Sequence, residues 1–173
     1  MASRKFKLPG LSEYLEEVKQ VTAREAATRI VGELVFLGPW YSGEFAKNWV
    51  VRTGDKRIPA TVQQKPGLSR TSRQVVPAPV VPSLKGTGRK RAVGYTIGNR
   101  TVYRNIALDL VPGRVEGARE ISAPADWYRT YIEAGSLKDT LRAAVASAAQ
   151  NPKIKGFGSY RSSNPQGARL VNQ

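Results

Sequence analysis

The chain contains no cysteine and no histidine among its 173 residues. Their absence excludes disulfides, thiol nucleophiles, histidine zinc sites and every catalytic triad that uses a histidine. Acidic residues are also few, 13 against 28 Lys and Arg, which gives a formal net charge of +15. No apolar run is long enough for a membrane span or a signal peptide, so we expect a soluble protein that is not exported.

The few carboxylates are scattered along the chain. Asp55, Asp109, Asp126 and Asp139 stand far apart, whereas a metal-dependent nuclease needs carboxylates that converge on a cation. Residues 86–91 lack the spacing and the Lys-Ser/Thr ending of a phosphate-binding loop. The sequence therefore predicts no enzyme, no cofactor and no metal site.

The excess positive charge is concentrated in the middle of the chain, where residues 47–119 carry fifteen basic and three acidic side chains. Residues 63–91 combine four prolines with seven basic and no acidic side chains. We expect them to form an extended loop or arm that carries charge away from the core and contributes little to it. Its basic residues are candidates for contact with DNA or with an acidic protein partner: Lys65, Arg70, Arg73, Lys85, Arg89, Lys90 and Arg91.

Apolar residues at three- and four-residue spacings predict a long helix from Ser12, a suitable N-cap, to Gly38. Strand-like runs follow at 49–52 and 57–62, and the turn composition between them predicts a hairpin. Strand composition returns at 92–97 and 101–110, with an expected turn at Gly98-Asn99.

A last helix is expected to begin at Ser122 or Asp126 and to break at Gly135-Ser136. The predicted fold class is therefore α+β, with a long N-terminal helix, a small antiparallel sheet carrying the Pro-rich basic loop, and a C-terminal helix. We expect residues 1–150 to form a single domain and residues 151–173 a flexible basic tail.

The segment from Gly38 to Val51 combines a helix end, a polar turn and the start of a strand. It resembles the small tail-completion or neck proteins of tailed bacteriophages, in which a Pro, a Thr/Ser-Gly pair, aromatic or basic residues and a Ser/Asn-Trp pair follow the first helix. These places are filled here by Pro39, Ser42, Gly43, Asn48 and Trp49. Residues 99–113 match a second family feature loosely, with Ile106 where an aromatic residue is usual.

The resemblance implies a structural virion protein of the phage neck or upper tail. Its subunits would form a closed homo-oligomeric ring that joins the portal or head to the tail around the DNA channel. Portal or adaptor proteins and tail proteins would be its partners, and passing DNA would meet the lumen without sequence preference. The resemblance also implies location in the virion, and in the host cytoplasm during assembly, with no membrane association.

The main alternative is a free, non-enzymatic nucleic-acid-binding protein of the ribosomal or nucleoid type. Basic and aromatic residues occur together around residues 89–95 and again in the tail, the combination that phosphate contact and base stacking need. The tail residues concerned are Lys153, Lys155, Phe157, Tyr160 and Arg161. No helix-turn-helix, zinc knuckle or aromatic RNA-binding strand pair is recognisable, so this alternative predicts nonspecific binding.

Overall fold

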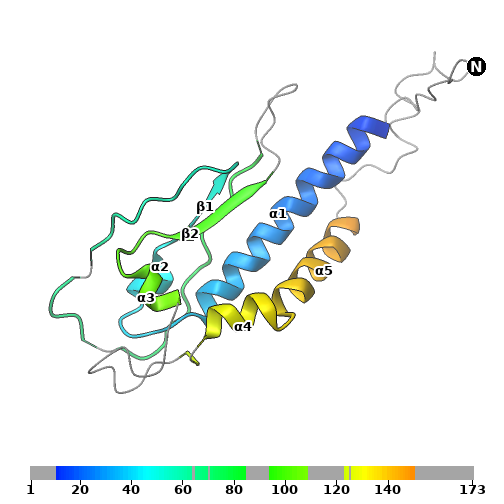
Figure 1. The fold of residues 1–173 in the computed structure, drawn as a ribbon. Helices are drawn as coiled ribbons and strands as arrows, with labels where there is room; N and C mark the ends of the chain where they lie inside the picture. The colour runs from blue at the N-terminus through cyan, green and yellow to red at the C-terminus, as the bar shows by residue number, and fades with distance from the viewer. Residues whose placement is uncertain are drawn as a thin grey trace, which may run out of the picture.

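The structure is a computed structural model that describes residues 11–63, 65–69, 71–84, 94–108, 123–124 and 126–150. It confirms the α+β class, with a long N-terminal helix, a small antiparallel sheet and C-terminal helices (Figure 1). The elements in chain order are α1 (Leu11–Leu37), α2 (Glu44–Lys47), β1 (Trp49–Thr53), β2 (Tyr95–Asn99), α3 (Arg104–Leu108), α4 (Trp127–Glu133) and α5 (Ser136–Ala149). The predicted tail, residues 151–173, lies outside the described residues.

The long helix α1 is the element on which the rest of the domain packs. Figure 1 shows the two strands along one side of α1 and α5 along the other. Val31 of α1 is completely buried, and the small side chains of Ala144 and Ala148 let α5 approach closely. Ser147 of α5 also donates to Glu25 of α1 over 3.5 Å. The core of the domain therefore surrounds the C-terminal half of α1.

The sheet has two antiparallel strands, with Trp49 opposite Asn99 and Thr53 opposite Tyr95. The predicted hairpin between 49–52 and 57–62 is therefore wrong. Pro59 explains part of the error, since proline has no backbone donor for a strand ladder.

Residues 54–62 cross the outer face of the sheet instead. Ile58 is buried over Gly98, where an added Cβ would lie 3.1 Å from the Ile58 Cδ1 atom. Val62 then forms an isolated parallel bridge with Thr101.

A second correction concerns the predicted turn at Gly98-Asn99. Both residues belong to β2, and residues 104–108 of the expected strand 101–110 form the helix α3. The chain turns just after β2, where the Asn99 side-chain oxygen accepts hydrogen bonds from the backbone N–H and the hydroxyl of Thr101. Such side-chain to backbone bonds offer the chain an alternative to a strand ladder.

The Pro-rich segment does not lead away from the core over residues 71–84. Val81 is buried and Val76 packs against the core, while Val75 and Val80 are exposed. The Tyr95 hydroxyl holds the far end of the segment by donating to the Pro82 carbonyl over 2.7 Å. Residues 71–84 form neither helix nor strand, and the expectation that they contribute little core is wrong.

The C-terminal helical region agrees with the prediction. Helix α4 begins directly after Asp126, and Gly135, with a positive φ of 100°, separates α4 from α5. The buried Trp127 anchors α4, because its Nε1 donates to the carbonyl of Ala107 over 2.8 Å. The long helix, the sheet and α4 thus meet at one end of the domain.

Candidate functional site

The five residues that resemble the neck-protein signature run from the end of α1 to the first residue of β1. Gly43 adopts a positive φ of 81° and starts the short helix α2, which the sequence did not predict. The Asn48 side chain donates to the carbonyl of Glu44 over 2.7 Å and closes that helix. Trp49 then opens β1 and is buried, while Pro39 and Ser42 are half-buried. The signature residues therefore build the turn that joins helix to sheet.

An aromatic cluster centred on Phe45 of α2 occupies this corner of the core. Its ring centroid lies 5.6 Å from that of Trp49, 6.3 Å from that of Tyr103 and 6.5 Å from that of Trp127. The contacts of Phe45 with Trp49 and Trp127 are edge-on, an arrangement that stabilises beyond the apolar area it buries. Burial raises the pKa of Tyr103, and the nearby charge of Glu44 raises it further, so the phenol stays neutral.

Gly43→Ala is expected to destabilise the domain by at least about 1–2 kcal/mol, because an L residue with a positive φ is strained. The new Cβ would also lie 2.8 Å from Trp40 Cη2, so the Trp40 ring would have to move. Gly54→Ala is the matched control, since Gly54 has a φ of 76° and no atom within 4 Å of the added Cβ. Denaturant unfolding should show a larger loss for Gly43→Ala, and equal losses would mean that the contact with Trp40 is unimportant.

Asn99 is a buried polar residue that the sequence placed in a turn and at the start of the loosely matched second family feature. Its side chain donates to the carbonyl of Phe45 over 2.7 Å and accepts from the Thr101 hydroxyl over 2.8 Å. Asn99 is 1% exposed and Thr101 is completely buried. The sequence signal was an Asn two residues before a Thr at a strand end, a pattern typical of side-chain-stabilised turns. Asn99 thus ties β2 to α2.

Of the seven basic candidates in the Pro-rich segment, the structure describes Lys65 and Arg73. Lys65 is exposed. Arg73 donates to the carbonyls of Phe36 and Gly38, the latter over 3.2 Å, and its guanidinium lies 5.3 Å from the centroid of the Phe36 ring. The last turn of α1 has no basic residue of its own, so Arg73 supplies the positive charge that a helix C-terminus favours. Arg73 is therefore engaged within the fold.

The remaining candidates lie outside the described residues: Arg70, Lys85, Arg89, Lys90 and Arg91. Their proposed contact with DNA or an acidic partner stays a prediction.

Arg73→Gln is expected to lower the free energy of unfolding by about 1–2 kcal/mol, because the variant loses charge-assisted hydrogen bonds to helix carbonyls. It should also increase proteolysis within residues 71–76, since Arg73 holds this segment on α1. Lys65→Gln removes the same charge from an exposed position and should change neither property. A variant as stable and as protease-resistant as the wild type would show that Arg73 does not fasten the segment.

A second set of basic residues was not predicted and lies on the outer face of the sheet. The Arg52 side chain donates to the carbonyl of Arg57 over 3.4 Å, and that of Arg100 donates to the Thr61 hydroxyl over 3.2 Å. Beside them, Arg104 donates to the carbonyls of Ile58 and Asn99 over 2.8 and 2.9 Å. We call Arg52, Arg57 and Arg100 the arginine face, because these three are exposed whereas Arg104 is half-buried.

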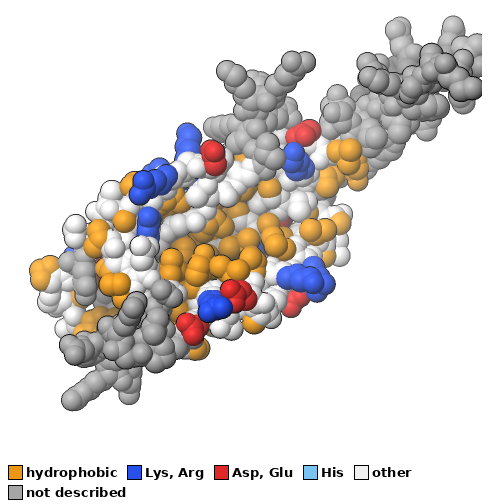
Figure 2. All heavy atoms as spheres, viewed as in Figure 1, with side chains coloured by type: hydrophobic (Ala, Val, Ile, Leu, Met, Phe, Trp, Pro, Cys, Tyr) orange, Lys and Arg blue, Asp and Glu red, His pale blue; other side chains and the backbone are white. Residues whose placement is uncertain are grey.

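Two groups stand out among the exposed large apolar side chains of the described residues, which also include Leu15, Val80, Val102, Ile106 and Ile132. The junction patch comprises Phe36, Tyr41 and Val75, which lie around the contacts that fasten residues 71–73 to α1 and its following turn. The α5 patch comprises Leu141 and Val145, one helical turn apart, beside the stripe of α5 that α1 covers. Figure 2 also shows apolar side chains across the middle of the visible face, with charged groups on both sides. Exposed apolar groups of this kind are typical of protein contacts.

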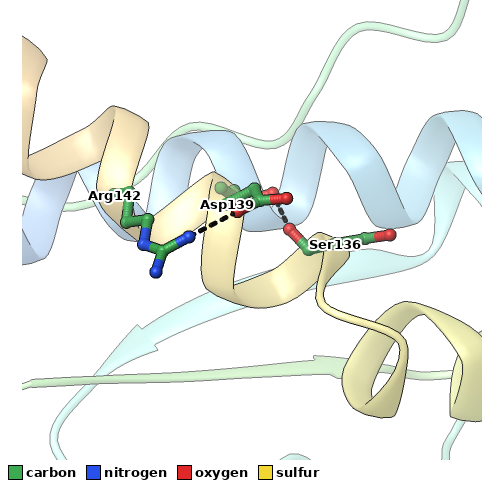
Figure 3. A network of polar contacts seen from close by, with 4 residues as sticks. Ser136, Asp139 and Arg142 are labelled. Carbon is green, nitrogen blue, oxygen red and sulfur yellow. Dashed lines mark hydrogen bonds and ion pairs between the residues drawn. The ribbon is translucent and has the colours of Figure 1, made fainter.

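A network of polar contacts lies at the start of α5. The network joins Arg142 to Asp139 over 3.1 Å and the Thr140 hydroxyl to the Ser136 carbonyl over 2.9 Å (Figure 3). These contacts lie within the first two turns of α5. The described part of the chain holds no group of three or more residues suited to a metal ion. None of its helices is long and apolar enough to cross a membrane.

Comparisons with protein-family models, with curated proteins and with solved structures found no match to this chain.

Proposed function

We propose that the chain is a structural protein of the neck or upper tail of a tailed bacteriophage, and that its subunits form a closed ring joining portal or head to tail. The connection between α1 and β1 carries the proposal. The signature residues stand there in the expected order, between a long helix and the first strand: Pro39, Ser42, Gly43, Asn48 and Trp49. Gly43 forms the turn before α2, Asn48 closes α2, and Trp49 lies in the core.

The exposed apolar groups support assembly into a ring. A closed ring needs head-to-tail contacts in which two different surfaces of each subunit meet. The junction patch and the α5 patch lie on different elements and provide two such surfaces. In this proposal, portal or adaptor proteins and tail proteins contact the ring above and below. The protein resides in the virion after assembly in the host cytoplasm, without enzymatic activity, cofactor or membrane contact.

Genetic removal of the chain from its phage tests this proposal. We expect filled heads and separate tails in electron micrographs, and restoration of joined particles by the wild-type chain supplied in trans. A phage that assembles and infects without the chain would contradict the neck assignment.

A variant of the α5 patch tests the ring contact. Leu141→Asp with Val145→Asp should fail to restore joined particles, because two charges would be buried at a subunit contact. Ala143→Asp with Ala146→Asp is the matched control, since both alanines are exposed on the other side of α5. Restoration by the first variant would show that the α5 patch is not a ring contact.

The second candidate function is a free nucleic-acid-binding protein, which the uncompensated arginine face favours. The two candidates differ in location. A free binding protein would be spread along nucleic acid, whereas a neck protein would occupy one site in each particle.

A further inference from the structure

We propose that the arginine face, Arg52, Arg57 and Arg100, binds the phosphate backbone of duplex DNA. The inference deepens the ring proposal and rests on it for its biological setting, because it names the surface of the subunit that meets DNA. The binding itself is a property of the single chain and can be measured on the purified protein.

The strand register places the arginines on the side of the sheet away from α1. Trp49 and Val51 are buried on the inner side, and side chains alternate along a strand, so Arg52 lies on the outer side. Arg100 follows the buried Asn99 and is exposed. Residues 54–62 cross this same outer side and bring Arg57 next to Arg52. Figure 2 shows Lys and Arg side chains gathered over the segment that follows β1 in Figure 1.

Each arginine of the sheet is held in place while most of its donors stay available. Arg52 uses Nη1 for the Arg57 carbonyl, and Arg100 uses Nη2 for the Thr61 hydroxyl. A guanidinium has five N–H donors in a planar fork that matches the geometry of phosphate. One such bond therefore orients the group without exhausting it.

The positive charge of the arginine face is not neutralised within the described part of the chain. None of its three arginines forms an ion pair there, whereas arginines on the helices do. Arg129 pairs with Glu133 over 2.9 Å, and Arg142 pairs with Asp139 over 3.1 Å. Uncompensated charge on a fixed surface attracts an anionic partner.

The spacing and composition of the face favour duplex DNA. Arg52 lies opposite Thr96, and Arg100 follows four residues later, which corresponds to about 13 Å along the sheet. This is comparable to the ~12 Å width of the major groove of B-DNA, so both side chains can reach phosphates that flank one groove.

Single-stranded nucleic acid and a protein partner fit the arginine face less well than duplex DNA. Single-stranded binding relies on stacking aromatics, and the exposed aromatics of the described chain, Phe36 and Tyr41, lie in the junction patch. A protein interface needs an apolar centre. No large apolar side chain is exposed between Arg52 and Arg100 on the described outer face, since Ile58 is buried there.

Fluorescence anisotropy with the purified full chain and a short labelled DNA duplex tests the inference across a range of salt concentrations. The triple variant Arg52→Gln, Arg57→Gln and Arg100→Gln should bind at least about tenfold more weakly at low salt. Its slope of log affinity against log salt should fall by up to about 2.7, because each neutralised phosphate contributes about 0.9. The matched control is Arg129→Gln, Lys138→Gln and Arg142→Gln, which removes the same charge from α4 and α5 and should change affinity less than about twofold.

Four results would overturn the inference. They are absence of DNA binding by the wild type, unchanged binding by the arginine-face variant, equal losses in both triple variants, and displacement of DNA by polyglutamate as effectively as by unlabelled duplex. Arg57→Glu provides a second test that spares the hydrogen bonds of the fold, because the Arg57 side chain makes none with the described residues. It should also weaken binding with an unchanged melting temperature, and unchanged binding would again overturn the inference.

The experiments distinguish a failure of this inference from a failure of the ring proposal. A neck ring that binds no DNA through this face would overturn only the inference. DNA binding through this face by a protein absent from the neck would overturn only the ring.

Discussion

Replacing Trp49 by alanine is expected to lower the free energy of unfolding by about 3–5 kcal/mol, the usual cost of deleting a large core side chain. Trp49 is 4% exposed, packs edge-on against Phe45, and lies opposite Asn99 on the inner side of the sheet. Its neighbour on that side, Val51, is also buried. Denaturant unfolding followed by circular dichroism measures the loss.

Trp49→Phe is the informative control for this prediction. The buried Nε1 of Trp49 finds no acceptor among the described residues, so a phenylalanine would remove an unsatisfied donor and keep the ring contact with Phe45. We expect its cost to be less than about 2 kcal/mol. A soluble Trp49→Ala protein with an unchanged melting temperature would show that Trp49 is a contact residue for a partner and not part of the core.

Asn99→Ala is expected to cost about 3 kcal/mol or more, because it leaves buried partners without hydrogen bonds. In the variant, the carbonyl of Phe45 and the backbone N–H and hydroxyl of Thr101 lose the hydrogen bonds that Asn99 makes with them. The loss should appear as a lower denaturant midpoint with an unchanged slope. Asn105→Ala, at an exposed position of α3, should change stability by less than about 0.5 kcal/mol. Similar stabilities for the two variants would contradict the role assigned to Asn99.

Local signals in the sequence were sufficient for α1, α4 and α5, but not for the short helices α2 and α3. The apolar spacing and the Gly38-Pro39 stop placed α1, and Gly135 placed the break between α4 and α5. These features depend on residues only a few positions apart, which is why the sequence reveals them.

Strand pairing could not be predicted in the same way, because it depends on contacts between distant residues. β1 pairs with β2 across the whole Pro-rich segment, and the nearer run fails as a partner because Pro59 interrupts it and Ile58 is buried on the outer face. Gly98 suggested a turn, but in the fold it allows the close approach of Ile58.

The roles of the basic residues also could not be predicted from the sequence, because they depend on contacts between distant residues. The concentration of basic residues in the sequence made Arg73 a candidate for contact with DNA or an acidic partner. In the structure its side chain instead donates to carbonyls at the end of α1. Arg52 and Arg100 are far apart in the chain and carry no local signal, and only the register of β1 and β2 brings them to one face. A charged residue can be assigned to a surface only after the strand pairing is known.

Electron cryomicroscopy of intact phage particles tests the central claim most directly. The account predicts density for the chain as a closed ring between portal and tail, with the elements α1, β1 and α5 recognisable in every subunit. Finding the chain dispersed along the genome, or as single copies on ribosomal RNA, would contradict it.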